Sequence, residues 1–198
     1  MTSTDICNMA LSYLGRGRIN SLDEDSEESR QCSIHYDHDR RRLLHYFPWG
    51  FARRMEKLAE RTDTVPGWRY CYGYPSECLH VLFVFDEEHA ARRQEERQDY
   101  GVITMNAGVR AIGSDVEEAW TEYIYDAKDP SRFSDEFSDA LAHMLAASLA
   151  LQLTGSTSLQ QLQLQLAEDN INRAKYYAAI EEERRIRYPR HYREARNQ

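Results

Sequence analysis

The sequence lacks the motifs that mark the commonest catalytic and nucleotide-binding sites. It has no nucleophile elbow, no glycine-rich loop that cradles phosphates, no HExxH zinc motif and no dinucleotide fingerprint. Its first residues also lack a basic segment followed by an apolar run and a small-residue cleavage site, so we expect no secretion signal and maturation in the cytoplasm. We predict neither an enzyme nor a cofactor-binding protein.

Long hydrophobic runs are equally scarce. The most apolar stretch, residues 140–153, is too short to cross a membrane, and Asp139 and His143 interrupt the apolar pattern around it. Hydrophobic residues make up 41% of the chain and charged residues 29%, which is typical of a globular protein and not of a disordered one. We therefore expect a globular protein without a membrane span.

Cysteine is sparse, and its spacing fits neither a zinc site nor a redox pair. No two cysteines form a CxxC motif, and no histidine stands beside them at zinc-site spacing. We therefore expect free, mostly buried thiols. The four cysteines are Cys7, Cys32, Cys71 and Cys78.

One short segment does collect possible metal ligands. His35, Asp37, His38 and Asp39 fall in a predicted helix, in which His35 and Asp39 share a face. This spacing permits a two-point metal site, but the sequence places no third strong ligand beside it. A solvated helix face is the favoured interpretation, so we predict no metal centre.

The chain is acidic, with 33 acidic residues, 25 basic residues and a net charge of −8 at pH 7. Because phosphates are bound mainly by Lys and Arg, this charge argues against nucleic-acid binding as the primary role, although it suits a surface that DNA slides past. Pairs of carboxylates such as Glu117 and Glu118 are expected by chance in so acidic a chain, so they do not by themselves indicate a glycoside hydrolase.

Residues 140–153, ALAHMLAASLALQL, are the most strongly helical stretch. Ser134 or Asp135 can cap the start of this helix, and Gly155 can end it in the left-handed conformation. Two rows of apolar side chains on adjoining faces predict a buried central helix. One row is flat, with Ala142, Ala146 and Ala150, and the other is bulky, with Leu141, Leu145, Leu149 and Leu153.

Apolar residues at spacings of three and four predict further helices at residues 4–15, 27–46 and 159–187. The start of the last segment is ambiguous, because some of its leucines alternate as in a strand, but its composition favours a helix. Its expected helical stripe is Leu159, Leu162, Leu166, Arg173 and Tyr177.

An aromatic corner follows the second predicted helix. Phe47, Trp49 and Phe51 stand within six residues beside Pro48, which should end that helix. We predict that these rings pin a corner between two helices, the second of which covers residues 51–59 and carries Arg53, Arg54 and Lys57.

The middle of the chain has the period of strands. We predict strands at residues 68–74, 78–85, 101–105 and 119–125, with turns at Asn106-Ala107-Gly108 and Gly113-Ser114-Asp115. The predicted fold class is α+β and mainly α, with a bundle of about four helices and an inserted antiparallel β unit. Residues 1–60 and 128–187 form the bundle, residues 61–127 the β unit, and residues 188–198 a flexible basic tail.

Four aromatic residues alternate along the first predicted strand. Trp68, Tyr70, Tyr72 and Tyr74 could stack on bases or sugars, which would fit a single-strand nucleic-acid binder. Packing of a sheet face or of a subunit seam is the favoured interpretation, because few basic side chains lie nearby to bind phosphates.

Several segments together resemble the tail tubular protein A family, the head-to-tail adaptors of short-tailed phages. They are, in chain order, ALSYLG, SLDEDSEESRQC, FPWGFARR, YGYPSECLHVL, DPSRFSDEF and ALAHMLAASLALQLTGS. The similarity covers roughly residues 5–180. Each piece is weak alone, but their combination is specific.

The resemblance implies a structural virion protein at the head-tail junction. We expect a ring of twelve copies between the portal protein and a tail nozzle of the tubular protein B type, with double-stranded DNA passing through without sequence-specific binding. Residues 184–198 carry a local charge of +5, against −13 for the rest of the chain. The residues expected to dock on the portal are Arg184, Arg185, Arg187, Arg190, Tyr192 and Arg193.

The charged stretch at residues 87–98 is long for a turn between two strands, and we expect it to contact the nozzle or a neighbouring subunit. The residues expected to make this contact are Glu87, Glu88, Arg92, Arg93, Glu95 and Glu96.

The alternative function is a virion-associated hydrolase of cell-wall or capsular polysaccharide, which needs two carboxylates across a cleft, one of them with a raised pKa.

Overall fold

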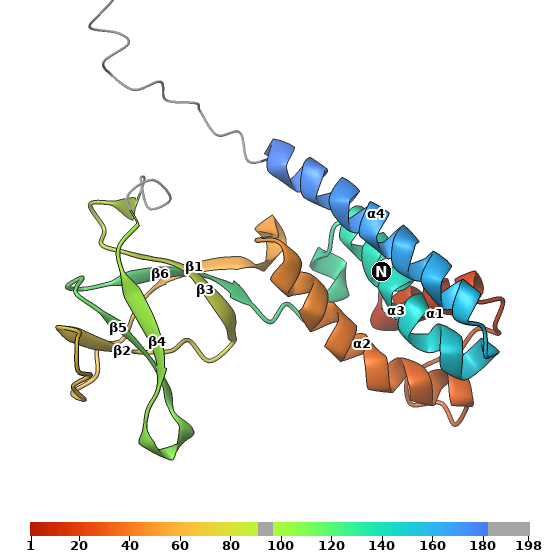
Figure 1. Ribbon diagram of the computed structural model, residues 1–198, viewed down its shortest axis with the longest axis horizontal. Coiled ribbons are helices and arrows are strands. Elements are labelled where there is room, and N and C mark those ends of the chain that lie inside the picture. Colours follow the sequence, from red (N-terminus) through yellow and green to blue (C-terminus); the bar gives the residue numbers. More distant parts are fainter. Residues whose placement is uncertain (91–96, 182–198) are drawn as a thin grey trace, which may run out of the picture.

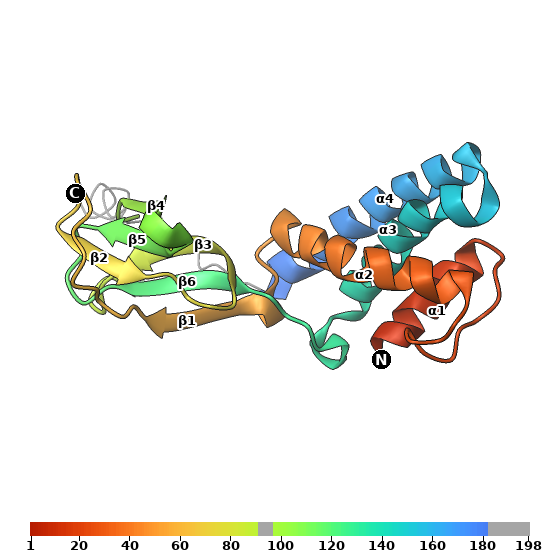
Figure 2. The same cartoon turned by 90° about the horizontal axis from the view of Figure 1, so that it is seen from below.

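The computed structural model describes residues 1–90 and 97–181 of the chain. Within these residues the fold is mixed α+β and mainly helical, with four α-helices and two three-stranded antiparallel sheets. The helices lie together at one end of an elongated molecule and the strands at the other (Figures 1 and 2). The predicted fold class is confirmed.

Side-chain caps fix the starts of the first three helices. Before α1, the Thr2 hydroxyl accepts a hydrogen bond from the Asp5 amide at 3.1 Å, and the Asp5 carboxylate accepts one from the Thr2 amide at 2.8 Å. Ser26 and Ser134 accept bonds from amides in the first turns of α2 and α3. The bounds are α1 Ser3–Tyr13, α2 Glu27–Tyr46, α3 Asp135–Thr154 and α4 Thr157–Glu181.

Helix α3 is the buried centre of the helical lobe, as predicted. Helices α1, α2 and α4 all pack against it. Its Ala142, Ala146 and Ala150 are fully buried. The helix ends at Gly155, whose φ of 67° lies in the left-handed region that glycine adopts without strain.

Replacing Ala146 by leucine is expected to lower the free energy of unfolding by about 1–3 kcal/mol. Ala146 has no exposed surface, so three added carbons must displace neighbouring side chains in a close-packed interior. Thermal unfolding followed by circular dichroism measures the effect. As a control, Leu151→Ala on the exposed side of α3 should cost much less. An unchanged melting temperature for Ala146→Leu would contradict this packing.

Helix α4 is confirmed over its described length, but its buried stripe differs from the expected one. Leu162, from the expected stripe, is 49% exposed. Gln163 is buried instead, because its Oε1 lies 2.8 Å from Nδ1 of His143 on α3. A pattern based on apolar residues cannot identify such a position. The buried stripe consists of Gln163, Ala167, Ile171 and Ala174.

An aromatic cluster forms the corner that follows α2. A 3-10 turn, η1 Gly50–Ala52, makes the bend. The Trp49 indole N–H donates to the Leu43 carbonyl at 3.0 Å, and the rings of Trp49 and Phe51 lie 5.2 and 4.9 Å from that of Phe137. The predicted corner is present, but it leads from a helix into a strand.

The predicted helix at residues 51–59 is wrong, because strand β1, Arg53–Lys57, occupies this segment and pairs antiparallel with β6. The Tyr123 hydroxyl of β6 donates to Glu56 at 3.0 Å, and Arg53 lies 3.4 Å from Glu122. The segment is almost entirely polar, so its sequence contains no apolar period that could distinguish a helix from an exposed edge strand. The ladder with β6 overrides its helix propensity.

The strand lobe contains two antiparallel sheets, with strand orders β1-β6-β3 and β2-β5-β4. The strands expected at residues 68–74, 78–85, 101–105 and 119–125 are confirmed, apart from shifts at their ends. The bounds are β2 Tyr70–Gly73, β3 Cys78–Phe85, β4 Tyr100–Thr104, β5 Arg110–Ser114 and β6 Trp120–Tyr125.

Strand β5 was missed, and the turn expected at Gly113-Ser114-Asp115 overlaps its end. Gly113 stands opposite Cys71 of β2 on one side and Gly101 of β4 on the other. Glycine in a strand often marks the close approach of another group. Here that group is the indole of Trp68, which lies over both glycines.

A fully buried arginine connects the two lobes. Nη1 of Arg40 on α2 donates to Oδ1 of Asp126 and to the Ala127 carbonyl, both at 2.7 Å. Nη2 of Arg41 donates to Oδ2 of Asp126 at 3.0 Å. Burial raises the pKa of Asp126, but the hydrogen bonds and positive charges of the two arginines outweigh it and hold this pKa below its ordinary value. Because Asp126 directly follows β6, this clamp holds the strand lobe against α2.

All four cysteines are free and buried, as predicted. None of the helices in residues 1–90 and 97–181 is both long enough and apolar enough to traverse a lipid bilayer.

Candidate interaction surfaces

The alternating aromatic residues pack against the strand lobe, with Tyr72 buried and Trp68, Tyr70 and Tyr74 partly exposed. Tyr72 is buried, and its hydroxyl donates to the Val116 carbonyl at 2.6 Å. The guanidinium of Arg110 lies 3.7 Å from the ring centroid of Tyr74. Burial raises the pKa of both tyrosines. The ring of Tyr70 lies 6.3 Å from that of Tyr72.

Trp68 packs against a backbone surface. A Cβ atom built on Gly101 would lie 3.2 Å from the indole, and one built on Gly113 would lie only 2.6 Å from its Cγ. The two glycines therefore provide the space that the ring fills. With Trp68 and Tyr72 engaged in this way, the aromatic row is a packing feature and offers no continuous platform for stacking bases.

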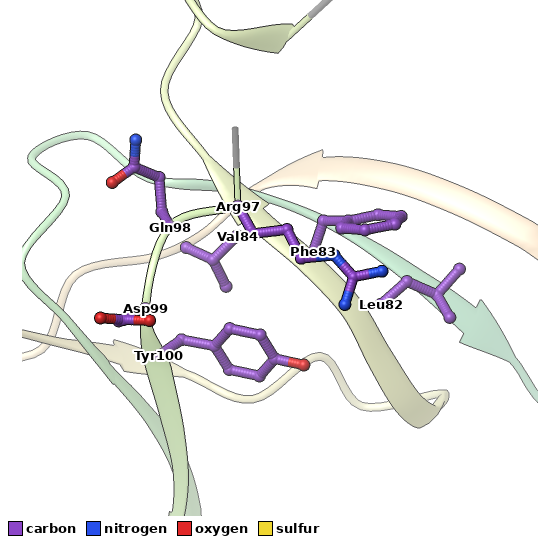
Figure 3. A pocket seen from close by; sticks show the side chains of 7 residues that line it. All are labelled: Leu82, Phe83, Val84, Arg97, Gln98, Asp99 and Tyr100. Carbon is purple, nitrogen blue, oxygen red and sulfur yellow. The ribbon is translucent and has the colours of Figure 1, made fainter. Parts of the chain in front are cut away.

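A small pocket lies between β3 and β4, which are edge strands of the two sheets (Figure 3). The Tyr100 hydroxyl donates across this seam to the Val81 carbonyl at 3.1 Å, and the guanidinium of Arg97 lies 5.3 Å from the ring centroid of Phe83. The volume of about 200 Å³ is below that of typical ligand pockets, which begin near about 300 Å³. The small volume and the hydrogen bond across the seam favour packing between the sheets over ligand binding.

Glu87 and Glu88 are exposed at an acidic pocket of about 520 Å³. Beside them, Asp86 accepts a hydrogen bond from the His89 amide at 2.7 Å and contacts the His89 ring at 2.6 Å. Burial raises the pKa of Asp86, but these contacts outweigh it and leave the pKa below its ordinary value. The pocket is lined by Asp86, Glu87, Glu88, Glu117, Glu118 and Trp120.

Many of the predicted contact residues lie outside the described residues. In the expected nozzle or neighbour contact these are Arg92, Arg93, Glu95 and Glu96. In the expected portal-docking segment they are Arg184, Arg185, Arg187, Arg190, Tyr192 and Arg193.

Three of the four possible metal ligands on α2, Asp37, His38 and Asp39, have other partners. Asp37 lies 3.1 Å from Nη2 of Arg40, and Asp39 lies 3.3 Å from Nδ1 of His38. Asp39 is buried, whereas His38 and Asp37 are exposed. In the described part of the chain, no group of three or more His, Cys, Asp or Glu side chains is arranged to bind a metal ion.

A notch that the sequence pattern does not predict lies between the last turns of α4 and the aromatic corner. Its volume is about 330 Å³, within the range of pockets that bind ligands or side chains. We call it the α4 notch. The aromatic corner at Trp49 and Phe51 and the tyrosine near the end of α4 were its sequence signals. Its principal lining residues are Trp49, Phe51, Phe133, Glu136, Tyr177 and Ile180.

The structure is therefore a mixed α+β fold whose candidate interaction sites are the surface pockets and the α4 notch. The sequence matches no known protein-family model and no curated protein.

Proposed function

We propose that the chain is a structural adaptor of short-tailed phage virions, which forms a ring of twelve copies between the portal protein and the tail nozzle. It is made in the host cytoplasm and assembled into the virion. Its ring surrounds the channel through which DNA passes, and it is needed for tail assembly and genome ejection.

The observation that carries this proposal is that three of the six resemblance motifs meet at one place. FPWGFARR, YGYPSECLHVL and DPSRFSDEF are far apart in the sequence, yet all contribute to the joint between the lobes. The rings of Phe51 and Phe133 lie 5.4 Å apart, and Arg54 forms an ion pair with Glu77. The Asp126 amide also donates to the Glu77 carbonyl at 2.8 Å. Shared motifs that form one structural unit are stronger support than separate short matches.

The charge distribution also supports a conduit protein. An acidic body repels the phosphate backbone, so DNA can pass without being held. The basic segment 184–198 has the opposite charge and suits an acidic partner surface. Electrostatic complementarity of this kind would direct the basic segment to an acidic portal surface, while the acidic body is repelled by the DNA.

The hydrolase alternative has less support. It requires a carboxylic acid whose pKa is raised so that it can protonate a leaving group. In the acidic pocket beside Trp120, the contacts with His89 lower the pKa of Asp86 instead. A zymogram that clears polysaccharide, and stops clearing after substitution of one pocket carboxylate, would favour this alternative.

Deleting residues 184–198 is expected to leave a folded protein that no longer binds portal rings. The deletion removes six arginines and the predicted docking residues. It should leave the protein folded, because α4, the last of the described elements, ends at Glu181. Co-sedimentation with purified portal rings measures binding, and circular dichroism checks folding. As a control, replacing the exposed Arg18 and Arg69 by glutamine removes positive charge elsewhere and should preserve binding. Undiminished co-sedimentation of the truncated protein would contradict the docking assignment.

A further inference from the structure

The end of α4 exposes apolar side chains beside the notch. Tyr177 and Ile180 are 48% and 57% exposed, although both line the notch. The opposite wall consists of the aromatic corner, where Trp49 is fixed by its hydrogen bond to Leu43. This is a rigid, mainly apolar site that an aliphatic or aromatic side chain fits.

The charge at the notch favours a basic occupant. Among the residues that the structure describes, Arg132 and Glu136 are the charged residues that line it. Arg132 has a carboxylate partner, because its Nε lies 3.7 Å from Oδ2 of Asp129. Glu136 therefore provides the negative charge beside the apolar walls, which suits an apolar side chain flanked by arginine.

The chain itself contains such a segment close to the notch. Residues 184–198 carry a charge of +5 and begin four residues after Ile180. Within them, Ile186, Tyr188 and Tyr192 stand among the arginines. Because Ile180 lines the notch and α4 ends at Glu181, the segment begins close to the notch.

We propose that the α4 notch binds residues 184–198 of the same chain, with an apolar side chain against Trp49 and Phe51 and an arginine paired with Glu136. Attachment to α4 gives the segment a high effective concentration at the notch, so a weak contact is enough for occupancy. Docking needs no portal and is independent of the proposed function. If that function holds, the portal competes with the notch for the same segment, and subunits release it on assembly.

Limited trypsin digestion of the full-length protein tests the docking. Cleavage after the arginines of residues 184–198 requires the segment to leave the notch, so its rate follows the undocked population. Glu136→Lys and Ile180→Ser should each accelerate the release of peptides from this segment by roughly tenfold, which corresponds to a docking constant of about ten in the unsubstituted chain. Mass spectrometry identifies the released peptides.

Two matched controls separate docking from general destabilisation. Asp135→Lys changes the charge in the same turn of α3, and Leu162→Ser removes a similarly exposed side chain from α4, but neither residue lines the notch. Both should leave the rate within about twofold of the original, because the docked population is unchanged.

Equal rates for the original chain and both notch variants would overturn the proposal. Rates that fall as protein concentration rises would also overturn it, because the segment of a second copy would then be the occupant. The assay contains no portal protein, so a negative result overturns the docking proposal without bearing on the proposed adaptor function.

Discussion

Replacing Arg40 by leucine is expected to lower the free energy of unfolding by about 3–5 kcal/mol. Arg40 is fully buried, and its Nη1 satisfies both the Asp126 carboxylate and the Ala127 carbonyl. Leucine cannot donate to either group, so the buried Ala127 carbonyl loses its donor, and Asp126, whose side chain is 11% exposed, keeps Arg41 as its remaining ion-pair partner. Urea denaturation followed by circular dichroism gives the free energy.

Arg41 provides a matched control for this prediction. It contacts the other oxygen of Asp126, but its side chain is 52% exposed. Arg41→Leu should therefore cost less than about 1 kcal/mol. In an Arg40→Leu background, Asp126→Ala should add less than it costs alone, because the two residues share one interaction. Equal costs for the two arginine variants would show that burial of Arg40 does not hold the lobes together.

The helices could be predicted because their signals are local. Ser134 and Gly155 occupy capping positions that the sequence marks, and each performs that role in the structure. The central helix is marked by its capping residues and by its apolar composition. Its burial follows from the same composition, because no exposed position could accommodate so many apolar side chains.

The two missed strands depend on residues distant in sequence. The segment Arg53–Lys57 is almost wholly charged and becomes a strand only because β6 pairs with it. Strand β5 contains Gly113, which indicates a turn when considered locally. Its extended form follows from pairing with β2 and β4 and from the position of Trp68. Sequence period cannot reveal such contacts.

The candidate sites were predictable to different degrees. The aromatic row was recognised and its packing role favoured, because Tyr72 and its neighbours alternate as one face of a strand does. The α4 notch was not recognised, since Trp49, Glu136 and Ile180 converge from three separate segments. Its formation requires the corner after α2, the start of α3 and the end of α4 to meet, which depends on the whole helical lobe.

Replacing Gly113 by alanine is expected to cost about 3 kcal/mol, near the upper end of the overpacking range. The added Cβ would lie 2.6 Å from Cγ of Trp68, a separation that real Cβ contacts do not show. The indole cannot retreat easily, because it is also in close contact with Gly101. Urea denaturation gives the free energy, and the near-ultraviolet circular dichroism of the tryptophans should change as the indole moves.

Gly73 provides the control, since a Cβ there would be 3.7 Å from the Ala59 carbonyl, an ordinary contact. Gly73→Ala should therefore change stability by no more than about 1 kcal/mol. Replacing Trp68 by alanine removes the obstacle, so adding Gly113→Ala to that variant should cost less than about 1 kcal/mol. If Gly113→Ala is as costly without the indole as with it, backbone conformation and not ring packing limits this position. A cost that disappears with the indole would mean that β5 has glycine because Trp68 packs there, and that Trp68 is a structural residue of the strand lobe.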